Sequence, residues 1–308
     1  MSFLEVEKNH TYTGHSDSVY TVEKGPNGQF FSAGGDGMIV LWDLNSGDQG
    51  RLIAKVSASV YALHYDEVED LLIVGQNYEG IHLVNVNQKT VVGSLKTGSP
   101  AIFDIKKSGS KIIIACGGGL VKIIDSKDLM TIKDLQFSEE SARCITISEE
   151  LGHFAIGYSD HKIRVFDLES LELLHELKGS TNSIFTVQYS PENAVLLSGG
   201  RDAKLRIWDT RNNYAMVETI NAHMYALNHL AFSPNANYFV TCSMDKSIKV
   251  WDAGSFKLLK VIDKSRHAGH GTSVNKLLWS SYKNQVIACS DDHSISVWNL
   301  EFNKNTTL

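Results

Sequence analysis

Residues 198–209 decide the fold, and they read Ser-Gly-Gly-Arg-Asp-Ala-Lys-Leu-Arg-Ile-Trp-Asp. The two glycines permit the backbone angles of a tight turn, and Asp202 can accept hydrogen bonds from the amides of that turn. After the turn, Leu205 and Ile207 alternate with charged residues, which is the pattern of a half-buried strand. The stretch therefore predicts two strands joined by a turn.

This stretch recurs along the whole chain. Close copies end at Trp42-Asp43, Trp251-Asp252 and Trp298-Asn299, and weaker copies end at 84–85, 124–125 and 166–167. The positions equivalent to the Trp are 42, 84, 124, 166, 208, 251 and 298, so successive spacings are 42, 40, 42, 42, 43 and 47 residues. A period of roughly 40–45 residues with a Trp-Asp ending is typical of a four-stranded propeller blade. Seven copies predict seven blades.

In its period and ending, the chain resembles the WD-repeat family. The residues that carry the resemblance are Trp42-Asp43, Trp208-Asp209 and Trp251-Asp252, together with the upstream pairs Gly14-His15, Ala222-His223 and Gly269-His270. The resemblance covers essentially the whole chain. It implies an all-β fold, a single seven-bladed propeller of four-stranded antiparallel blades. It implies little about function, because propellers carry many unrelated functions.

We expect one domain, residues 1–308, whose repeats end near residues 43, 85, 125, 167, 209, 252 and 299. The last repeat has no strand after its Trp, since the tail 302–308 is too short and polar to form a further one. Residues 3–12 are the segment that can complete the last blade. Their insertion would close the ring, as in the resembling family, and leave no exposed sheet edge between the chain ends.

Composition excludes several classes of protein. The chain has 29 Lys and Arg against 35 Asp and Glu, a formal charge of −6 and no basic run, so we expect no nucleic-acid partner. Neither a signal peptide nor an apolar run of membrane-spanning length is visible, so we expect a cytoplasmic protein. The cysteines show no Cys-x-x-Cys spacing, which predicts reduced core residues at Cys116, Cys144, Cys242 and Cys289.

The resemblance also implies a polar set of four side chains within a blade. The turn Asp bonds the upstream His, the His bonds a Ser or Thr, and that hydroxyl reaches the Trp ring N–H. The first repeat supplies His15, Ser32, Asp36 and Trp42, and the sixth supplies His223, Thr241, Asp245 and Trp251. The seventh supplies His270, Asp292 and Trp298, but Ala288 stands where the hydroxyl belongs, and the fifth has Ser180 in place of the His.

A Ser, a His and an Asp held together also suggest a hydrolase. Two observations oppose that interpretation: the set recurs in separate blades, and its hydroxyl is committed to the Trp. We therefore interpret the sets as buried networks that join turn to strand. The pair His267 and His270 is too sparse for zinc, so we expect no metal, cofactor or catalytic residue.

In the resembling family the Asp turn and the His loop lie on one rim of the propeller, the top face. The residue about five positions after the His faces the channel mouth, and this column reads Tyr20, Tyr61, Phe103, Cys144, Phe185, Asn228 and Asn275. The residue before the turn Asp also faces the top, and this column reads Gly35, Asn77, Gly117, Ser159, Arg201, Met244 and Asp291. Two surface features complete this prediction: a basic spot from Lys264 and Arg266 on a top loop, and a solvated acidic turn at 66–70.

These columns predict a non-catalytic scaffold that binds a partner protein or peptide on its top face, as a monomer or within a larger complex. Aromatic and Arg side chains are preferred interface anchors. The predicted partner-binding residues are Tyr20, Tyr61, Phe103, Phe185, Arg201, Asn228, Met244 and Asn275. One alternative is that the aromatic residues only plug the channel, and another is that they sense a small molecule or cation. A hydrolase at the mouth is disfavoured, because the columns contain one carboxylate and no His.

Overall fold

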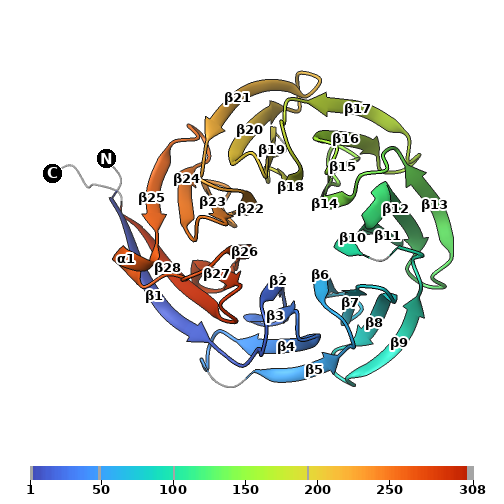
Figure 1. The fold of residues 1–308 in the computed structure, drawn as a ribbon, viewed down its shortest axis with the longest axis horizontal. Helices are drawn as coiled ribbons and strands as arrows, with labels where there is room; N and C mark the ends of the chain where they lie inside the picture. Colours follow the sequence, from blue (N-terminus) through green and yellow to red (C-terminus); the bar gives the residue numbers. More distant parts are fainter. Residues whose placement is uncertain (1–2, 48–49, 100, 193, 304–308) are drawn as a thin grey trace.

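The computed structural model describes residues 3–47, 50–99, 101–192 and 194–303, and in them the chain forms seven four-stranded antiparallel sheets. The sheets stand as blades around a common centre (Figure 1). The prediction of an all-β, seven-bladed propeller is confirmed. Helical structure in the described residues is limited to α1 (Lys264–His267) and two short 3-10 turns, η1 (Gly117–Gly119) and η2 (Tyr282–Asn284).

The first four blades each run from an inner to an outer strand in chain order. The first contains β2 (Val19–Lys24), β3 (Gln29–Gly34), β4 (Met38–Asp43) and β5 (Arg51–Lys55). The second contains β6 (Val60–Asp66), β7 (Leu71–Gln76), β8 (Gly80–Asn85) and β9 (Thr90–Leu95). The third contains β10 (Ile102–Ser108), β11 (Lys111–Cys116), β12 (Leu120–Asp125) and β13 (Thr131–Gln136). The fourth contains β14 (Ala142–Ser148), β15 (His153–Tyr158), β16 (Lys162–Asp167) and β17 (Leu173–Lys178).

The last three blades follow the same plan, except that the seventh takes its outer strand from the start of the chain. The fifth contains β18 (Ile184–Tyr189), β19 (Val195–Gly200), β20 (Lys204–Asp209) and β21 (Ala215–Asn221). The sixth contains β22 (Leu227–Phe232), β23 (Tyr238–Ser243), β24 (Ile248–Asp252) and β25 (Leu258–Ile262). The seventh contains β26 (Val274–Trp279), β27 (Gln285–Ser290), β28 (Ile295–Asn303) and β1 (Phe3–Tyr12).

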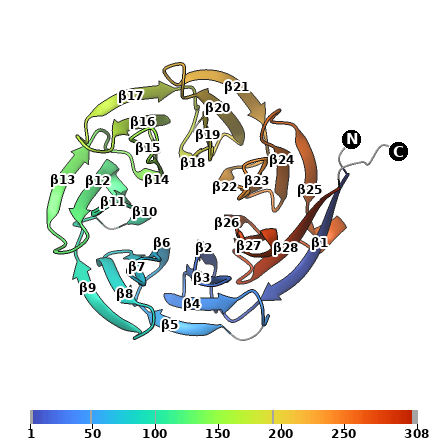
Figure 2. The same cartoon turned by 180° about the vertical axis from the view of Figure 1, so that it is seen from behind.

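Strand β1 closes the ring. It pairs antiparallel with β28 from Phe3 opposite Asn303 to Tyr12 opposite Ile295, and Figure 2 shows the two strands side by side at the rim. Tyr12 is buried, and its hydroxyl donates to the backbone carbonyl of Asp43 at 2.7 Å. The N-terminal strand therefore completes the seventh blade and also ties it to the first.

The core lies between neighbouring blades, which cover the inner and middle strands on both faces. In β11, Ile112, Ile113 and Ile114 follow one another and all are fully buried. Such strands are continuous apolar runs, whereas most of the outer strand β21 is exposed. The four cysteines are buried and form no disulfide, as the sequence predicted.

The acidic turn of the second blade differs from the prediction. Asp66 forms an ion pair with Lys107 of the third blade, and both side chains are largely buried. Val68 at the tip of this turn is 94% exposed. The turn is therefore solvated only at its tip, because its first carboxylate joins two blades. In the described part of the chain, no helix is long and apolar enough to cross a membrane.

Candidate functional site

One backbone hydrogen bond recurs in all seven blades and defines which residues are equivalent. The residue before the turn Asp donates its N–H to a carbonyl just before the inner strand, as Gly35 does to Ser18 and Arg201 does to Ser183, each at 2.9 Å. The equivalent donors are Asn77, Gly117, Ser159, Met244 and Asp291. The backbones approach so closely that a Cβ on Gly34 would lie 2.0 Å from the Ser18 oxygen. Gly34 is thus required by packing in the first blade, although other blades have larger residues at the equivalent position.

Two residues after that carbonyl, every inner strand contains a bulge that directs one side chain to the channel mouth. The bulged residues are Tyr20, Tyr61, Phe103, Arg143, Phe185, Asn228 and Asn275. The prediction of Cys144 in this column is wrong, because Cys144 pairs with Gly157 and is buried. Arg143 holds the position instead, since the fourth repeat has no His from which to count.

Five of the bulged side chains form a continuous arc, which we call the aromatic–arginine arc: Tyr20, Tyr61, Phe103, Arg143 and Phe185. The ring centroids of Tyr20 and Tyr61 are 4.5 Å apart, and those of Tyr61 and Phe103 are 6.2 Å apart. The Arg143 guanidinium lies 3.9 Å from the ring centroid of Phe103 and 5.1 Å from that of Phe185. Arg143 therefore joins the two phenylalanines by cation–π contacts.

The two asparagines of the column have a different role. The Asn228 side-chain amide donates to the Val274 carbonyl at 2.8 Å, and that of Asn275 donates to the Val19 carbonyl at 2.9 Å. Both bonds join one blade to the next. These amides are therefore engaged within the ring, whereas the faces of the arc remain half-exposed.

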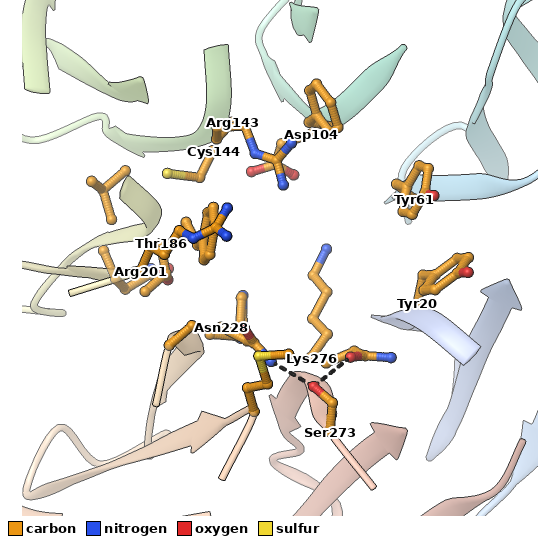
Figure 3. A pocket seen from close by; sticks show the side chains of 18 of the residues that line it. Tyr20, Tyr61, Asp104, Arg143, Cys144, Thr186, Arg201, Asn228, Ser273 and Lys276 are labelled. Atoms are coloured by element: carbon orange, nitrogen blue, oxygen red, sulfur yellow. Dashed lines mark hydrogen bonds between the residues drawn. The ribbon is translucent and has the colours of Figure 1, made fainter. Parts of the chain in front are cut away.

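The arc borders a cavity of about 740 Å³ at the channel mouth (Figure 3). Its floor includes Asp104, Lys106, Thr186, His229 and Lys276, and its rim includes Arg201, Met224, Tyr225 and Met244. Met224, Tyr225 and Met244 are 83%, 62% and 59% exposed, which is unusual for large apolar side chains.

Sequence reasoning missed Met224 and Tyr225, although a signal was present. They follow His223 directly, at the positions where the first repeat has the small or polar residues Ser16 and Asp17 after His15. Two large apolar residues on a loop that is otherwise polar indicate a surface feature of the sixth blade.

Burial controls the charge states of side chains on the inner strands. It lowers the pKa of His64 and of His229 to about 3 each, with nearby Lys106 or Lys276 acting in the same direction, so both imidazoles are neutral near pH 7. Burial also raises the pKa of Glu23 and lowers that of Arg143. The channel is therefore an environment in which uncompensated charge is costly.

The polar set of the first blade is assembled around His15. His15 Nδ1 lies 3.0 Å from Asp36 Oδ2, and His15 Nε2 lies 2.7 Å from Ser32 Oγ. The Trp42 indole N–H donates to the same oxygen at 2.7 Å. The Ser32 hydroxyl proton then points to Nε2, so that Nδ1–H of a neutral imidazole donates to Asp36.

The sixth blade contains the same set. His223 Nδ1 lies 3.0 Å from Asp245 Oδ2, and His223 Nε2 lies 2.8 Å from Thr241 Oγ1. The Trp251 indole N–H donates to Thr241 Oγ1 at 2.9 Å. Each set binds the entry loop, the turn and two strands of one blade.

The seventh blade corrects the expectation that its set lacks a hydroxyl. Ser296, which pairs with Ala288 across the sheet, lies 2.7 Å from His270 Nε2 and accepts the Trp298 N–H at 2.8 Å. His270 Nδ1 lies 2.9 Å from Asp292 Oδ2. The hydroxyl is therefore supplied by the neighbouring strand.

The fourth and fifth blades, which lack the loop His, place an arginine at the strand position that Ser296 occupies in the seventh. In the fifth blade Arg206 Nη2 lies 2.6 Å from Asp202 Oδ2, and in the fourth Arg164 Nη2 lies 2.7 Å from Asp160 Oδ2. Both arginines are 2% exposed. A guanidinium on the strand thus replaces the imidazole on the loop as partner of the turn Asp.

These sets offer no reactive nucleophile. Ser32, Thr241 and Ser296 are fully buried, and each accepts a Trp N–H. Among the described residues, no group of three His, Cys, Asp or Glu is arranged to hold a metal ion.

The top loop with Lys264 and Arg266 does not reach the channel. It forms α1 at the outer edge of the ring beside β1 (Figure 1). Its N-cap residue Asp263 accepts the Arg266 N–H at 2.9 Å, and the Lys8 ammonium of β1 donates to the Ala268 carbonyl at 2.9 Å. The basic spot thus lies apart from the cavity.

Comparison with known proteins places these features in context. The chain is 25% identical to the Striatin homolog of Dictyostelium discoideum over 285 residues, which are 85% of this chain and 31% of that protein. It is 25% identical to Protein tipD of the same organism over 270 residues, 84% of this chain and 43% of that protein. The chain thus spans less than half the length of either relative.

The WD40 beta propeller domain of Doa1 has the same fold, with a TM-score of 0.83 and 16% identity over 96% of this chain and 97% of that domain. The family described as WD domain, G-beta repeat matches residues 6–43, 171–209, 215–252 and 261–299. These matches cover half of the sequence. They include the four repeats that end in Trp-Asp or Trp-Asn, namely the first, fifth, sixth and seventh. The chain therefore belongs to the WD40 repeat family.

Proposed function

We propose that this protein is a non-catalytic interaction scaffold whose top face binds a segment of a partner protein at the channel mouth. The observation that carries the proposal is the aromatic–arginine arc, which borders an open cavity of about 740 Å³. Aromatic rings bury a large area while losing little side-chain freedom, so a few of them can dominate a binding energy. A cytoplasmic, monomeric propeller, alone or within a larger complex, is part of this proposal.

The open volume favours binding over a plug. Side chains that only sealed the channel would be expected to fill the mouth, but the arc lines one side of it and leaves the rim of the sixth blade exposed. Met224, Tyr225 and Met244 lie on that rim and present flexible or aromatic surface. Together the two sides form a cleft with apolar walls, which suits an extended peptide or a loop.

Two other functions fit the site less well. A sensor for cations would need free aromatic faces, but Arg143 already lies over Phe103 and Phe185 and would repel a second cation. A hydrolase would need an accessible nucleophile, and the hydroxyls of the Ser–His–Asp sets are buried against Trp.

The test compares partner capture by the wild type with capture by Tyr61→Ala and Phe103→Ala. Affinity enrichment from cell extract identifies proteins that bind the wild type, and purified candidates are then titrated against each variant. We expect each substitution to weaken binding by roughly 2 kcal/mol or more while the melting temperature stays near that of the wild type.

The matched control is Val68→Ser on the opposite rim, where the side chain is 94% exposed. Asp66 is unsuitable as a control because it pairs with Lys107. Partners that bind both arc variants as tightly as the wild type would contradict the proposal. If Phe103→Ala unfolds the protein, the arc is a plug.

A further inference from the structure

The acidic side chains that line the cavity are all occupied by donors of the protein itself. Asp104 accepts the backbone N–H groups of Ile105 at 3.0 Å and Ile145 at 2.9 Å, and its Oδ1 lies 3.7 Å from Lys106 Nζ. Asp202 is paired with Arg206, and Asp291 accepts the amide of Asn275 at 2.8 Å. None of these acids needs an external cation.

Apart from Lys106, which lies near Asp104, the basic side chains of the cavity have no such partners. Among the described residues, no carboxylate lies within ion-pair distance of Arg143, Arg201 or Lys276. Arg143 contacts aromatic faces, and the one hydrogen bond of the Lys276 ammonium goes to Thr21 Oγ1 at 3.2 Å. In Figure 3, Lys276 extends into the middle of the cavity, and Arg143 and Arg201 lie across from it.

Electrostatic coupling keeps the buried acid of the cavity ionised. Burial acts to raise the pKa of Asp104, but Lys106, Lys276 and the Ile145 N–H outweigh it and hold that pKa below its usual value. Asp104 therefore stays ionised and is satisfied by backbone donors as well as by charge. Arg143, Arg201 and Lys276 outnumber Asp291, the acid of the cavity lining that has no ion pair among the described residues. The charge left unpaired at the mouth is therefore positive on balance, on a protein whose formal charge is −6.

Resting on the proposed function, we propose that the bound partner segment carries an acidic side chain, which enters the cavity toward Arg143 and Lys276, next to an aliphatic or aromatic side chain. A carboxylate suits these donors because a guanidinium offers it paired N–H groups and an ammonium offers a point charge. The apolar neighbour packs on Met224, Tyr225 and Met244, which lie on the same rim as Arg201. A basic segment would instead bring further positive charge to three unpaired cations.

The test begins with a random peptide library displayed on phage and selected on the wild-type protein. Display through a C-terminal fusion removes the free terminal carboxylate, so any selected acid is a side chain. The best peptide is then synthesised with an amidated C-terminus, in parallel with a version in which the amide isostere replaces its acidic residue. Fluorescence polarisation gives Kd for both peptides on the wild type, Tyr61→Ala, Arg201→Gln, Lys276→Gln and Lys127→Gln.

We expect the selected peptides to share an acidic residue beside an apolar one. Replacing the acid by its amide should weaken binding to the wild type by about tenfold or more. On Lys276→Gln the difference between the acid and the amide should shrink, because one of the two cations that distinguish them is absent while Arg143 remains. Arg201→Gln should give a smaller loss, since Arg201 is exposed, and Lys127→Gln, an exposed lysine on the opposite rim, should give none.

The outcomes separate the two proposals. Peptides that are lost on Tyr61→Ala but carry no acid, or bind equally as acid and amide, would overturn the acidic-segment inference and leave the binding surface intact. Peptides that bind Tyr61→Ala normally, or a selection that enriches none, would overturn the proposed function and the inference with it. Circular dichroism melts of each variant verify that the losses do not arise from unfolding.

Discussion

The interiors of the blades and the channel mouth both contain charged side chains, but they differ in whether those charges have a partner within the fold. Inside the first blade, Asp36 accepts hydrogen bonds from His15 and from two backbone N–H groups. At the mouth, no carboxylate among the described residues lies within ion-pair distance of Arg143 or Lys276. The repeat determines where a polar side chain stands, and its partners within the fold distinguish a structural role from a binding one.

Within the blades, the turn Asp keeps a hydrogen-bond or ion-pair partner even where the type of residue that provides it differs. The turn Asp meets a His in the first, sixth and seventh blades and an Arg in the fourth and fifth. The substitution moves the donor from the entry loop to the third strand of the blade. Substitutions in the interior should therefore reduce the stability of the protein, and substitutions at the mouth should reduce its binding of a partner.

The largest effect is expected where a whole set of interior partners is removed. Deletion of residues 3–12 takes away the backbone pairs of β28, the buried side chain of Leu4 and the bond from Tyr12 to the first blade. We expect a lower melting temperature and aggregation, because an unpaired strand edge is exposed. Light scattering and thermal melts measure both effects.

A synthetic peptide of residues 3–12 provides the matching control. Added to the truncated protein, it should restore part of the lost melting temperature by pairing with β28. A truncated protein that remains monomeric and melts like the wild type would contradict the role of β1 in closing the ring.

The next largest effect is expected at Arg206. Arg206→Val leaves the largely buried Asp202 without its ion-pair partner, and breaking a buried pair costs roughly 3–5 kcal/mol of unfolding free energy. Arg211→Ala, which removes an exposed arginine of the same blade, should cost no more than about 0.5 kcal/mol. Urea denaturation measures both values.

A swap between blades sharpens this prediction. Val40 of the first blade occupies the position of Arg206, and His15 occupies that of Ser180. The double variant Ser180→His with Arg206→Val would recreate the set of the first blade, since Ser198, Asp202 and Trp208 are already present. It should be more stable than Arg206→Val alone, and equal stability would mean that the two donors are not interchangeable.

A smaller loss of unfolding free energy is expected for His223→Ala, because Asp245 and Thr241 each lose one hydrogen-bond partner. The cost should be roughly 1–3 kcal/mol, as for other buried groups that lose a hydrogen bond. His175→Ala on the outer strand β17 should cost less, because His175 packs on the Tyr214 ring and its side chain is only partly buried. Equal costs in denaturant melts would contradict the assignment of the sets.

Lowering the pH should reduce the contribution of His223 to the stability of the protein. Burial lowers the pKa of His223 below its usual value near 6.5, although Asp245 opposes the shift. Because the folded-state pKa lies below the unfolded one, this stability is complete above about pH 6.5 and is lost as the pH falls toward the folded-state pKa. The difference in unfolding free energy between wild type and His223→Ala should therefore shrink from about pH 7.5 to about pH 5.5, by at most about 1.4 kcal/mol per pH unit. A constant or widening difference would contradict this sign.

Much of the interior could be predicted because it recurs at fixed distances from the Trp. The blade number, the closing strand and the His15 set all follow from that spacing. The hydroxyl of Ser296 was missed because it comes from the strand opposite Ala288, and pairing across a sheet is not visible in one repeat. Arg143 was missed because Ser138 stands at the position of the loop His and was not recognised as the start of the count: five residues after Ser138 is Arg143, whereas Cys144 is six residues after it.

The mouth could be predicted only in part. Counting from the position of the loop His predicted that Tyr20 and Tyr61 lie at the channel mouth. The contact between their rings, however, joins two blades, and no single repeat contains it. The contact of Arg143 with Phe103 and Phe185 joins three blades, and each repeat alone would show an unremarkable residue. Which charges remain unpaired can therefore be read from the assembled ring and not from the sequence pattern.

The smallest effect on stability is expected at the mouth, and it is the sharpest test of the comparison. Arg201 is exposed and has no ion-pair partner among the described residues, so Arg201→Gln should change the unfolding free energy by no more than about 0.5 kcal/mol. The same variant should weaken binding of a partner and reduce the salt dependence of that binding, because it removes a charge that faces the cavity. Thermal melts and titrations at two salt concentrations measure the two effects on one protein. A loss of stability comparable to that of Arg206→Val would mean that Arg201 belongs to the paired interior, and the distinction between the two regions would fail at this residue.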